Sequence, residues 1–279
     1  MDRRAFLQRT AAFVGGGLAW SRLGYAGTMR ADMSDIGLQL YTLRSILEDD
    51  FAGTLERVAD VGYVNLEFAG YYDHSPAEVK GMLDDLGLVA RAGHFGLGEL
   101  EEDAGAVIEG AATLGMEYVI VPSLPGDIRS SLDGYRSVAA TFNEFGEQCR
   151  EAGLQFGYHN HSFEFEAVDG QLPYDLLLDE TDEELVAMEL DIAWITNAGH
   201  DPLAYFERNP GRFHLWHVKD ITEGGDLADV GDGRIDWPTL FAHADQSGLR
   251  YGIVEHDRPG DDPVASIAAS YAYLDGILD

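Results

Sequence analysis

From residue 27 onward, the chain alternates between short apolar runs and longer amphipathic runs. Strand-like runs that alternate with helix-like runs predict a parallel sheet with crossover helices. No linker or low-complexity stretch interrupts the pattern, and eight unbroken units favour a closed barrel over an open, doubly wound sheet. We therefore predict a single (β/α)8 TIM barrel over residues 27–279. The predicted strands cover 37–41, 64–68, 89–94, 118–122, 155–161, 187–191, 213–219 and 251–255.

Helix signals fall between the predicted strands. Ser75 and Glu78 match a capping box, and Pro76 stands at the first helical position. Apolar residues recur at helical spacing over 131–153 and 263–278. The sequence therefore predicts a helix at each of these three places.

Residues 1–26 differ from the rest of the chain. They hold four arginines and one acid, with an apolar, glycine-rich stretch at 11–20 and small residues around Ala26. This order of regions is typical of an export leader, which is excluded from the fold. The run from Asp2 to Leu7, with its Arg3-Arg4 pair, resembles the twin-arginine signal, whose pathway moves folded proteins. We expect an exported protein, periplasmic or extracellular, with no membrane association beyond this leader.

The chain is strongly acidic, with 50 Asp and Glu against 18 Lys and Arg and a formal net charge of −32. Lys80 and Lys219 are its only lysines. Such a surface opposes nucleic acid and anionic membranes as partners. It suits high salt, where screening removes the self-repulsion.

Polar residues stand at the ends of most predicted strands. In barrels of this kind the reactive residues lie at the carboxyl ends of the strands, because the βα loops build the site there. These polar strand ends are Glu67, His94, His159, His161, Glu189, Asp191, His217, Lys219, Glu255 and Asp257.

Strand geometry indicates that these side chains can meet. Alternate residues of a strand face the barrel interior, so two polar residues separated by one position share a face. His214 has the other parity, and we expect it to point outward toward the helices. Burying so many polar groups unpaired would cost about 2–7 kcal/mol each. The pattern therefore predicts one shared site.

Imidazoles and carboxylates that converge in one pocket are the ligands of a first-row divalent metal. The residues near His159, Asp191, His217 and Glu255 provide both kinds of group. Two nitrogens with two carboxylates suit Mn, Fe, Co, Ni or Zn better than Mg or Ca. We predict a divalent metal at the barrel mouth.

Five segments give the chain a resemblance to a known family. They are Tyr158–Glu164, Leu190–Asp191, His217–Asp220, Gly231–Trp237 and Val254–Glu255. The chain resembles the xylose isomerase-like barrels, especially the sugar phosphate isomerase/epimerase group and its Tyr-His-Asn-His subgroup. The resemblance covers essentially the whole mature chain, and its motifs are poorly specific for substrate.

The resemblance implies that Asp191, His217 and Glu255 are metal ligands and that the end of strand 5 supplies a fourth. In the keto-sugar epimerases of the family that fourth ligand is a glutamate, whereas this chain has His159, like the inosose dehydratases. The epimerases also use this glutamate and the strand-8 glutamate as their two acid/base groups. Only Glu255 of that pair remains here, so the second proton carrier is left open.

The other polar strand ends receive provisional roles. Candidates for the second proton carrier are Glu67, His94, His161 and Lys219. Lys219 could instead hold a substrate oxygen, or pair with Glu189 or Asp220. We assign catalysis to Glu255, Glu67 and Lys219, and substrate contact to His94, His161, Trp194 and Glu189.

A metal bound to a carbonyl and an adjacent hydroxyl stabilises the enediolate left when the α-carbon loses its proton, and a nearby carboxylate takes that proton. Reprotonation on the other face gives an epimer, reprotonation at the neighbouring carbon an isomer, and loss of a β-hydroxyl a dehydrated product. The first prediction is a metal-dependent epimerase or isomerase of a keto-sugar or related polyol. The second is a dehydratase or other β-eliminating lyase on a keto-sugar or inosose.

Two further classes are weaker. A non-catalytic sugar-binding barrel would not need Glu255 beside a complete ligand set. A phosphodiesterase like the apurinic endonucleases is opposed by the charge, and by Trp194 at a position where those nucleases place a metal histidine. The expected partner is a small carbohydrate.

Export should require the arginine pair. Replacing Arg3 and Arg4 by lysine keeps the charge but removes the paired guanidinium groups, so a folded precursor should stay in the cytoplasm. Cell fractionation measures this outcome. A Lys-Lys variant that is exported like the native chain would refute the twin-arginine interpretation.

Overall fold

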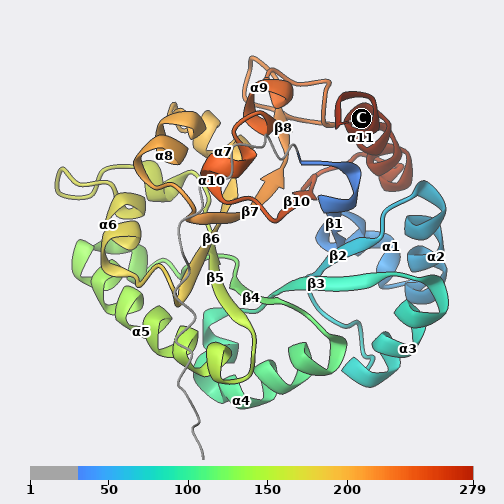
Figure 1. Ribbon diagram of the computed structural model, residues 1–279, viewed down its shortest axis with the longest axis horizontal. Coiled ribbons are helices and arrows are strands. Elements are labelled where there is room, and N and C mark those ends of the chain that lie inside the picture. The colour runs from blue at the N-terminus through green and yellow to red at the C-terminus, as the bar shows by residue number, and fades with distance from the viewer. Residues whose placement is uncertain (1–30, 279) are drawn as a thin grey trace, which may run out of the picture.

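Eight parallel strands close into a barrel, and the helices form a ring outside it (Figure 1). The structure, a computed structural model, describes residues 31–278. Neighbouring strands pair in the order β1-β10-β7-β6-β5-β4-β3-β2, and β2 pairs with β1 to close the ring. The predicted single (β/α)8 barrel is therefore confirmed. Its strands are β1 (Ile36–Gln39), β2 (Asn65–Phe68), β3 (Val89–His94), β4 (Tyr118–Val121), β5 (Gln155–His159), β6 (Val186–Asp191), β7 (Phe213–Val218) and β10 (Tyr251–Val254).

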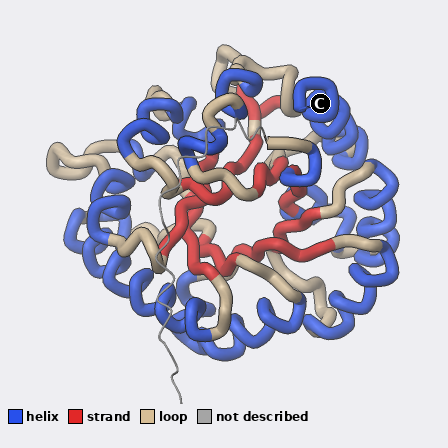
Figure 2. Tube along the Cα trace, viewed as in Figure 1, coloured by secondary structure: helices blue, strands red, loops and turns tan. Residues whose placement is uncertain are grey.

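Figure 2 shows the helices surrounding the strands on all sides. The three predicted helices are present as α3, α5 and α11, and Ser75 and Glu78 form the expected reciprocal capping box at the start of α3. The longer helices are α2 (Phe51–Val61), α3 (Pro76–Leu86), α4 (Leu97–Leu114), α5 (Leu132–Glu151), α6 (Pro173–Glu180), α8 (Pro202–Arg208) and α11 (Pro263–Leu278). The short ones are α1 (Arg44–Leu47), α7 (Ile192–Asn197), α9 (Trp237–Phe241) and α10 (Ala244–Ser247).

A small apolar cluster fills the barrel interior below the polar strand ends. Its members come from five different strands, so they can touch only inside the closed ring. Close packing here requires small residues: a Cβ on Gly37 would lie 2.8 Å from Ile253 Cδ1. The cluster gives the polar residues above it a rigid floor. It consists of Ala92, Tyr118, Ile120, Ala187, Leu215 and Ile253.

A bulge in β7 changes the direction of His214. Met188 pairs with Phe213, but the next residue of β6 pairs with Leu215, so His214 is the extra residue. Its Nδ1 lies 3.3 Å from the hydroxyl of Tyr118, a member of the floor cluster. The prediction that His214 points outward is therefore wrong, because simple alternation does not hold across a bulge.

The loop after β7 is organised around the carboxylate of Asp220, which begins the short antiparallel ribbon β8 (Asp220–Ile221) and β9 (Leu227–Ala228). Asp220 is fully buried. A Cβ on Gly233 would lie 2.0 Å from its Oδ1, so only glycine fits there. The carboxylate accepts four hydrogen bonds, from the backbone N–H groups of Ile221, Gly231 and Ile235 and from Trp237 Nε1.

Within residues 31–278, no helix is long and apolar enough to cross a membrane. The predicted leader, residues 1–26, lies outside the described residues.

The acidic surface should make the stability of the barrel depend on salt. Surface ion pairs such as Arg91–Glu117 and Arg136–Glu180 engage few of the 50 acids, so most of the repulsion is left to solvent ions. Raising NaCl from about 0.1 M to about 2 M should raise the melting temperature by about 5 °C or more. Calorimetry measures this shift, with sucrose at equal water activity as the control for solute exclusion. A melting temperature that does not respond to NaCl would contradict this account.

Candidate metal centre and active site

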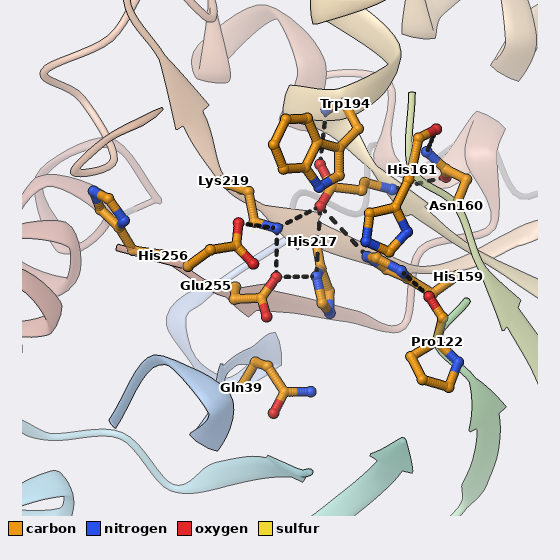
Figure 3. A network of polar contacts seen from close by, with 12 residues as sticks. Gln39, Pro122, His159, Asn160, His161, Trp194, His217, Lys219, Glu255 and His256 are labelled. Carbon is orange, nitrogen blue, oxygen red and sulfur yellow. Dashed lines mark hydrogen bonds and ion pairs between the residues drawn. The ribbon is translucent and has the colours of Figure 1, made fainter. Parts of the chain in front are cut away.

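The structure brings together the four residues that the sequence predicts as ligands. His159 and Asp191 end β5 and β6, His217 lies near the end of β7, and Glu255 directly follows β10. One potential ligand atom from each lies within 4.8 Å of the others, and all four side chains are buried. Figure 3 shows the side chains of His159, His217 and Glu255 lying close together. We call these four residues the upper group.

Hydrogen bonds outside the upper group orient its ligand atoms. The Nδ1–H of His159 donates to the carbonyl oxygen of Pro122 at 3.0 Å, which turns Nε2 inward. Asp191 Oδ1 caps α7 by accepting the N–H of Trp194 at 2.9 Å, which leaves Oδ2. His217 Nε2 lies 2.9 Å from Glu67 Oε2, which leaves Nδ1. Supports of this kind fix metal-binding side chains in proteins.

Three ligand atoms are buried and form no well-oriented hydrogen bond: His159 Nε2, Asp191 Oδ2 and His217 Nδ1. Asp191 Oδ2 and His217 Nδ1 do form ion pairs, with Lys219 and Glu255 respectively. Unsatisfied polar atoms are costly in a protein interior, and a bound ion would give all three atoms a common partner. The upper group therefore fits a metal ion with mixed nitrogen and oxygen ligands.

The protonation states of His159, Asp191 and Glu255 also fit a metal. Burial lowers the pKa of His159 well below its usual value, so its ring is neutral. Burial alone would raise the pKa of Asp191 and of Glu255, but Lys219 and neighbouring imidazoles hold both well below the usual range. Neutral imidazole and ionised carboxylate are the forms that bind metals. His217 differs: burial lowers its pKa, but Glu189 and Glu255 raise it well above the usual value, so its ring would have to lose a proton when an ion binds.

Lys219 lies beside the upper group and joins three carboxylates. Its Nζ is 2.8 Å from Asp191 Oδ2, 2.5 Å from Glu255 Oε2 and 3.0 Å from Asp257 Oδ2. Burial opposes the ammonium charge, but these carboxylates raise the pKa of Lys219 well above its usual value. The alternative partners considered from the sequence, Glu189 and Asp220, are not the ones it contacts. The Nζ also lies 5.2 Å from the centre of the Trp194 ring.

A second set of polar residues, the lower group, consists of Glu67, His94 and Glu189, in contact with His217. His94 Nε2 is 2.8 Å from Glu189 Oε2 and 3.3 Å from Glu67 Oε2. Burial raises the pKa of Glu67 and of Glu189 to about 7 each. Both glutamates are fully buried and do not line the cavity at the mouth. The structure thus places Glu67 and Glu189 where they support His217 and His94, and only His94 reaches the cavity.

A cavity of about 300 Å³ opens above the upper group. A larger one, of about 480 Å³, lies elsewhere between α3 and α4, and none of the predicted site residues lines it. The sequence analysis placed Asp257 among the polar strand ends but assigned it no role, whereas the structure places it in the lining of the cavity. Tyr41 and Ser123 carried no signal in the sequence. The cavity at the mouth is lined by Tyr41, Ala69, His94, Pro122, Ser123, His159, His161, Glu255 and Asp257.

His161 is held in a stack of rings at the cavity wall. Its imidazole lies nearly parallel to Phe163 at 5.4 Å and to Trp194 at 6.1 Å between ring centres. Its backbone N–H donates to Glu164 Oε2 at 2.8 Å, and the other oxygen of Glu164 accepts the Tyr158 hydroxyl. Burial lowers the pKa of His161. The spacing of the Tyr158–Glu164 segment is therefore explained by a loop that closes on itself to fix His161.

Comparison with known proteins agrees with this geometry. The sequence profile of the xylose isomerase-like TIM barrel matches residues 55–276. The chain belongs to this family.

Several known proteins are similar to this chain over most of their length. Inosose dehydratase from Lacticaseibacillus casei is 22% identical, with 91% of this chain and 95% of that protein covered. Inosose dehydratase from Geobacillus kaustophilus is 23% identical over 80% and 86% of the two chains. A solved sugar phosphate isomerase/epimerase from Parabacteroides distasonis is 30% identical, with a TM-score of 0.77 over 88% of this chain and 95% of that one. The zinc-containing IolI protein shares the fold, at 15% identity and a TM-score of 0.68, over 88% of this chain and 99% of that one.

Metal binding should depend on the upper group as a unit. His217→Ala and Asp191→Asn should each remove most bound metal and lower the melting temperature of the metal-loaded protein, because a ligand that binds only the native state stabilises it. Elemental analysis and calorimetry measure the two effects. His214→Ala, at the floor end of the same strand as His217, is the control and should keep its metal. Full metal occupancy in the His217 and Asp191 variants would refute the site.

Proposed function

We propose that this chain is a metal-dependent dehydratase of a keto-polyol. Two findings support the proposal: curated relatives named inosose dehydratase that match over nine-tenths of both chains, and the distribution of carboxylates in the cavity. The second is the observation that carries it. Among the lining residues only Glu255 and Asp257 are carboxylates, and both follow β10. The facing part of the lining, from β3 and β5, carries imidazoles.

An asymmetric cavity of this kind suits elimination better than epimerisation by two opposed carboxylates. Elimination requires one base for the α-hydrogen and help for the departing hydroxyl, whereas such an epimerase needs a carboxylate on each face of the carbon. His159 ends β5, the position at which the resemblance to the keto-sugar epimerases implies the second carboxylate. The chain therefore provides a carboxylate base on one side only.

The upper group would hold a first-row divalent cation, in the range Mn, Fe, Co, Ni or Zn, and the zinc in the IolI neighbour fits this range. When bound, the ion supplies Lewis-acid polarisation of the substrate carbonyl, which acidifies the α-hydrogen.

Glu255 is the proposed base. Its Oε2 contacts His217 Nδ1 at 2.8 Å and Lys219 Nζ at 2.5 Å, which leaves Oε1 to accept the α-proton. Lys219 keeps its ammonium charge beside this carboxylate, which holds Glu255 ionised and in place to accept the proton. His94 and His161, in the cavity wall, orient the hydroxyl groups of the substrate.

Isomerisation or epimerisation of the same kind of substrate is the second candidate. It is favoured by the two solved structures named sugar phosphate isomerase/epimerase, at 30% and 27% identity. Both candidates begin with removal of the same α-hydrogen, so they share Glu255 and diverge at the product. We further propose that the reaction takes place outside the cytoplasm, on the basis of the leader at 1–26.

Glu255→Gln separates catalysis from binding. In heavy water the native, metal-loaded protein should exchange the α-hydrogen of a keto-polyol for deuterium, and in ordinary water it should give a product about 18 Da lighter than the substrate; mass spectrometry measures both changes. The variant is nearly isosteric but cannot accept a proton, so exchange should fall by about 10²–10⁴-fold. Glu144→Gln, an exposed position on α5, is the control and should exchange at the native rate.

The product then distinguishes the candidates. Loss of water supports the dehydratase, whereas exchange with no change of mass other than deuterium supports the isomerase or epimerase. If the metal-loaded native protein binds keto-polyols but exchanges no carbon-bound hydrogen, the enzyme proposal fails in favour of a sugar-binding barrel.

A further inference from the structure

We infer that the substrate is an uncharged keto-polyol of monosaccharide size, without a phosphate or carboxylate group, and that Asp257 enforces this choice. The inference rests on the proposed function and goes further, because relatives of this chain are named for sugar phosphates. Three features of the barrel mouth carry it: the charge balance of the site, the occupied anion-binding groups of the nearby loop, and the size of the cavity.

No lysine or arginine lines the cavity among the described residues. Lys219, the nearest ammonium group, is 1% exposed and already contacts Asp191, Glu255 and Asp257. Three carboxylates, one ammonium and one divalent ion have no net charge. The site therefore has no positive charge left for a phosphate dianion, and burying such a group without a counter-charge is costly.

The loop after β7 also offers nothing to a phosphate. In TIM barrels phosphate groups are frequently bound by backbone N–H groups of the loops after strands 7 and 8. Here Asp220 accepts the N–H groups of Gly231 and Ile235, together with two further donors. A built-in carboxylate thus occupies donors that could otherwise hold an anion.

Arg44, at the rim, is likewise committed. Its two terminal nitrogens donate to the backbone carbonyl oxygens of Tyr41 and Asp257, at 2.8 and 2.7 Å. Its guanidinium group lies over the Tyr41 ring, 4.1 Å from the ring centre. Two of the five N–H groups of Arg44 are therefore used in fixing Tyr41 and the Asp257 backbone at the rim, and Arg44 is not among the residues that line the cavity.

Size and lining fit a single sugar-like ring. A cavity of about 300 Å³ is at the lower end of the range for ligand pockets. Tyr41 lines it and is 41% exposed, so its ring can pack against the carbon-bound hydrogens of a polyol. Asp257, His94 and His161 offer hydrogen-bonding groups for hydroxyls. Asp257 is the carboxylate in this lining that is not part of the upper group, and its charge repels an anionic substrate.

Paired ligands test the inference by binding alone. Calorimetric titration of the metal-loaded protein would use free ketoses and cyclic inososes, each compared with its own phosphate ester. Each ester should bind at least about 100-fold more weakly than its free parent. An ester that binds within about tenfold of its parent, or a panel in which no free compound binds, would overturn the inference.

Asp257→Asn tests the residue itself. Removing this charge should reduce the ratio of the dissociation constants of the ester and its free parent by about tenfold. Asp245→Asn, which removes an equal charge from an exposed position at the start of α10, should leave this ratio unchanged. An unchanged ratio in the Asp257 variant would overturn the role of Asp257 in excluding phosphate esters. Binding of free compounds without hydrogen exchange would refute the dehydratase proposal but leave this inference standing.

Discussion

The barrel mouth depends on the pairing of buried carboxylates with two cationic side chains. Asp191 and Glu255 are almost inaccessible to water, and Lys219 and His217 are their partners. Breaking a buried pair by removing one partner costs about 3–5 kcal/mol, because a charge is left without compensation. A divalent ion would enter the same balance. Metal binding and the stability of the mouth are thus linked, because the ion and the cationic side chains compensate the same carboxylates.

The fold could be predicted because its signals are local. The capping box at Ser75 and the unbroken alternation of strands and helices depend on residues that are neighbours in sequence. Strand ends were placed less well. The predicted fifth strand extends to residue 161, but β5 ends at His159, where Asn160 turns its side chain to accept the N–H of Asp191. His214 shows a similar limit, because a bulge is not visible in the alternation of side chains.

The upper group was predictable because strand ends in a closed barrel must converge, whichever helices lie between them. The roles of its neighbours were not. Glu67 and His217 are separated by 150 positions, and only the packed barrel shows that this glutamate lies beneath an imidazole and outside the cavity. Asp257 was placed among the polar strand ends but was given no role, yet its carboxylate lies 3.0 Å from Lys219 and lines the cavity.

The residues that build the site and those that face the substrate are largely different. Tyr158, Glu164 and Asp220 are buried, and each fixes a loop by satisfying polar groups within the protein. The motifs shared with the family are rich in residues of this kind, which explains why they identify the fold and the metal ligands better than the reaction. Tyr41, Ser123 and Asp257 lie outside those motifs and line the cavity. Substrate choice in this chain should therefore be sought at the rim of the cavity, where these three residues lie.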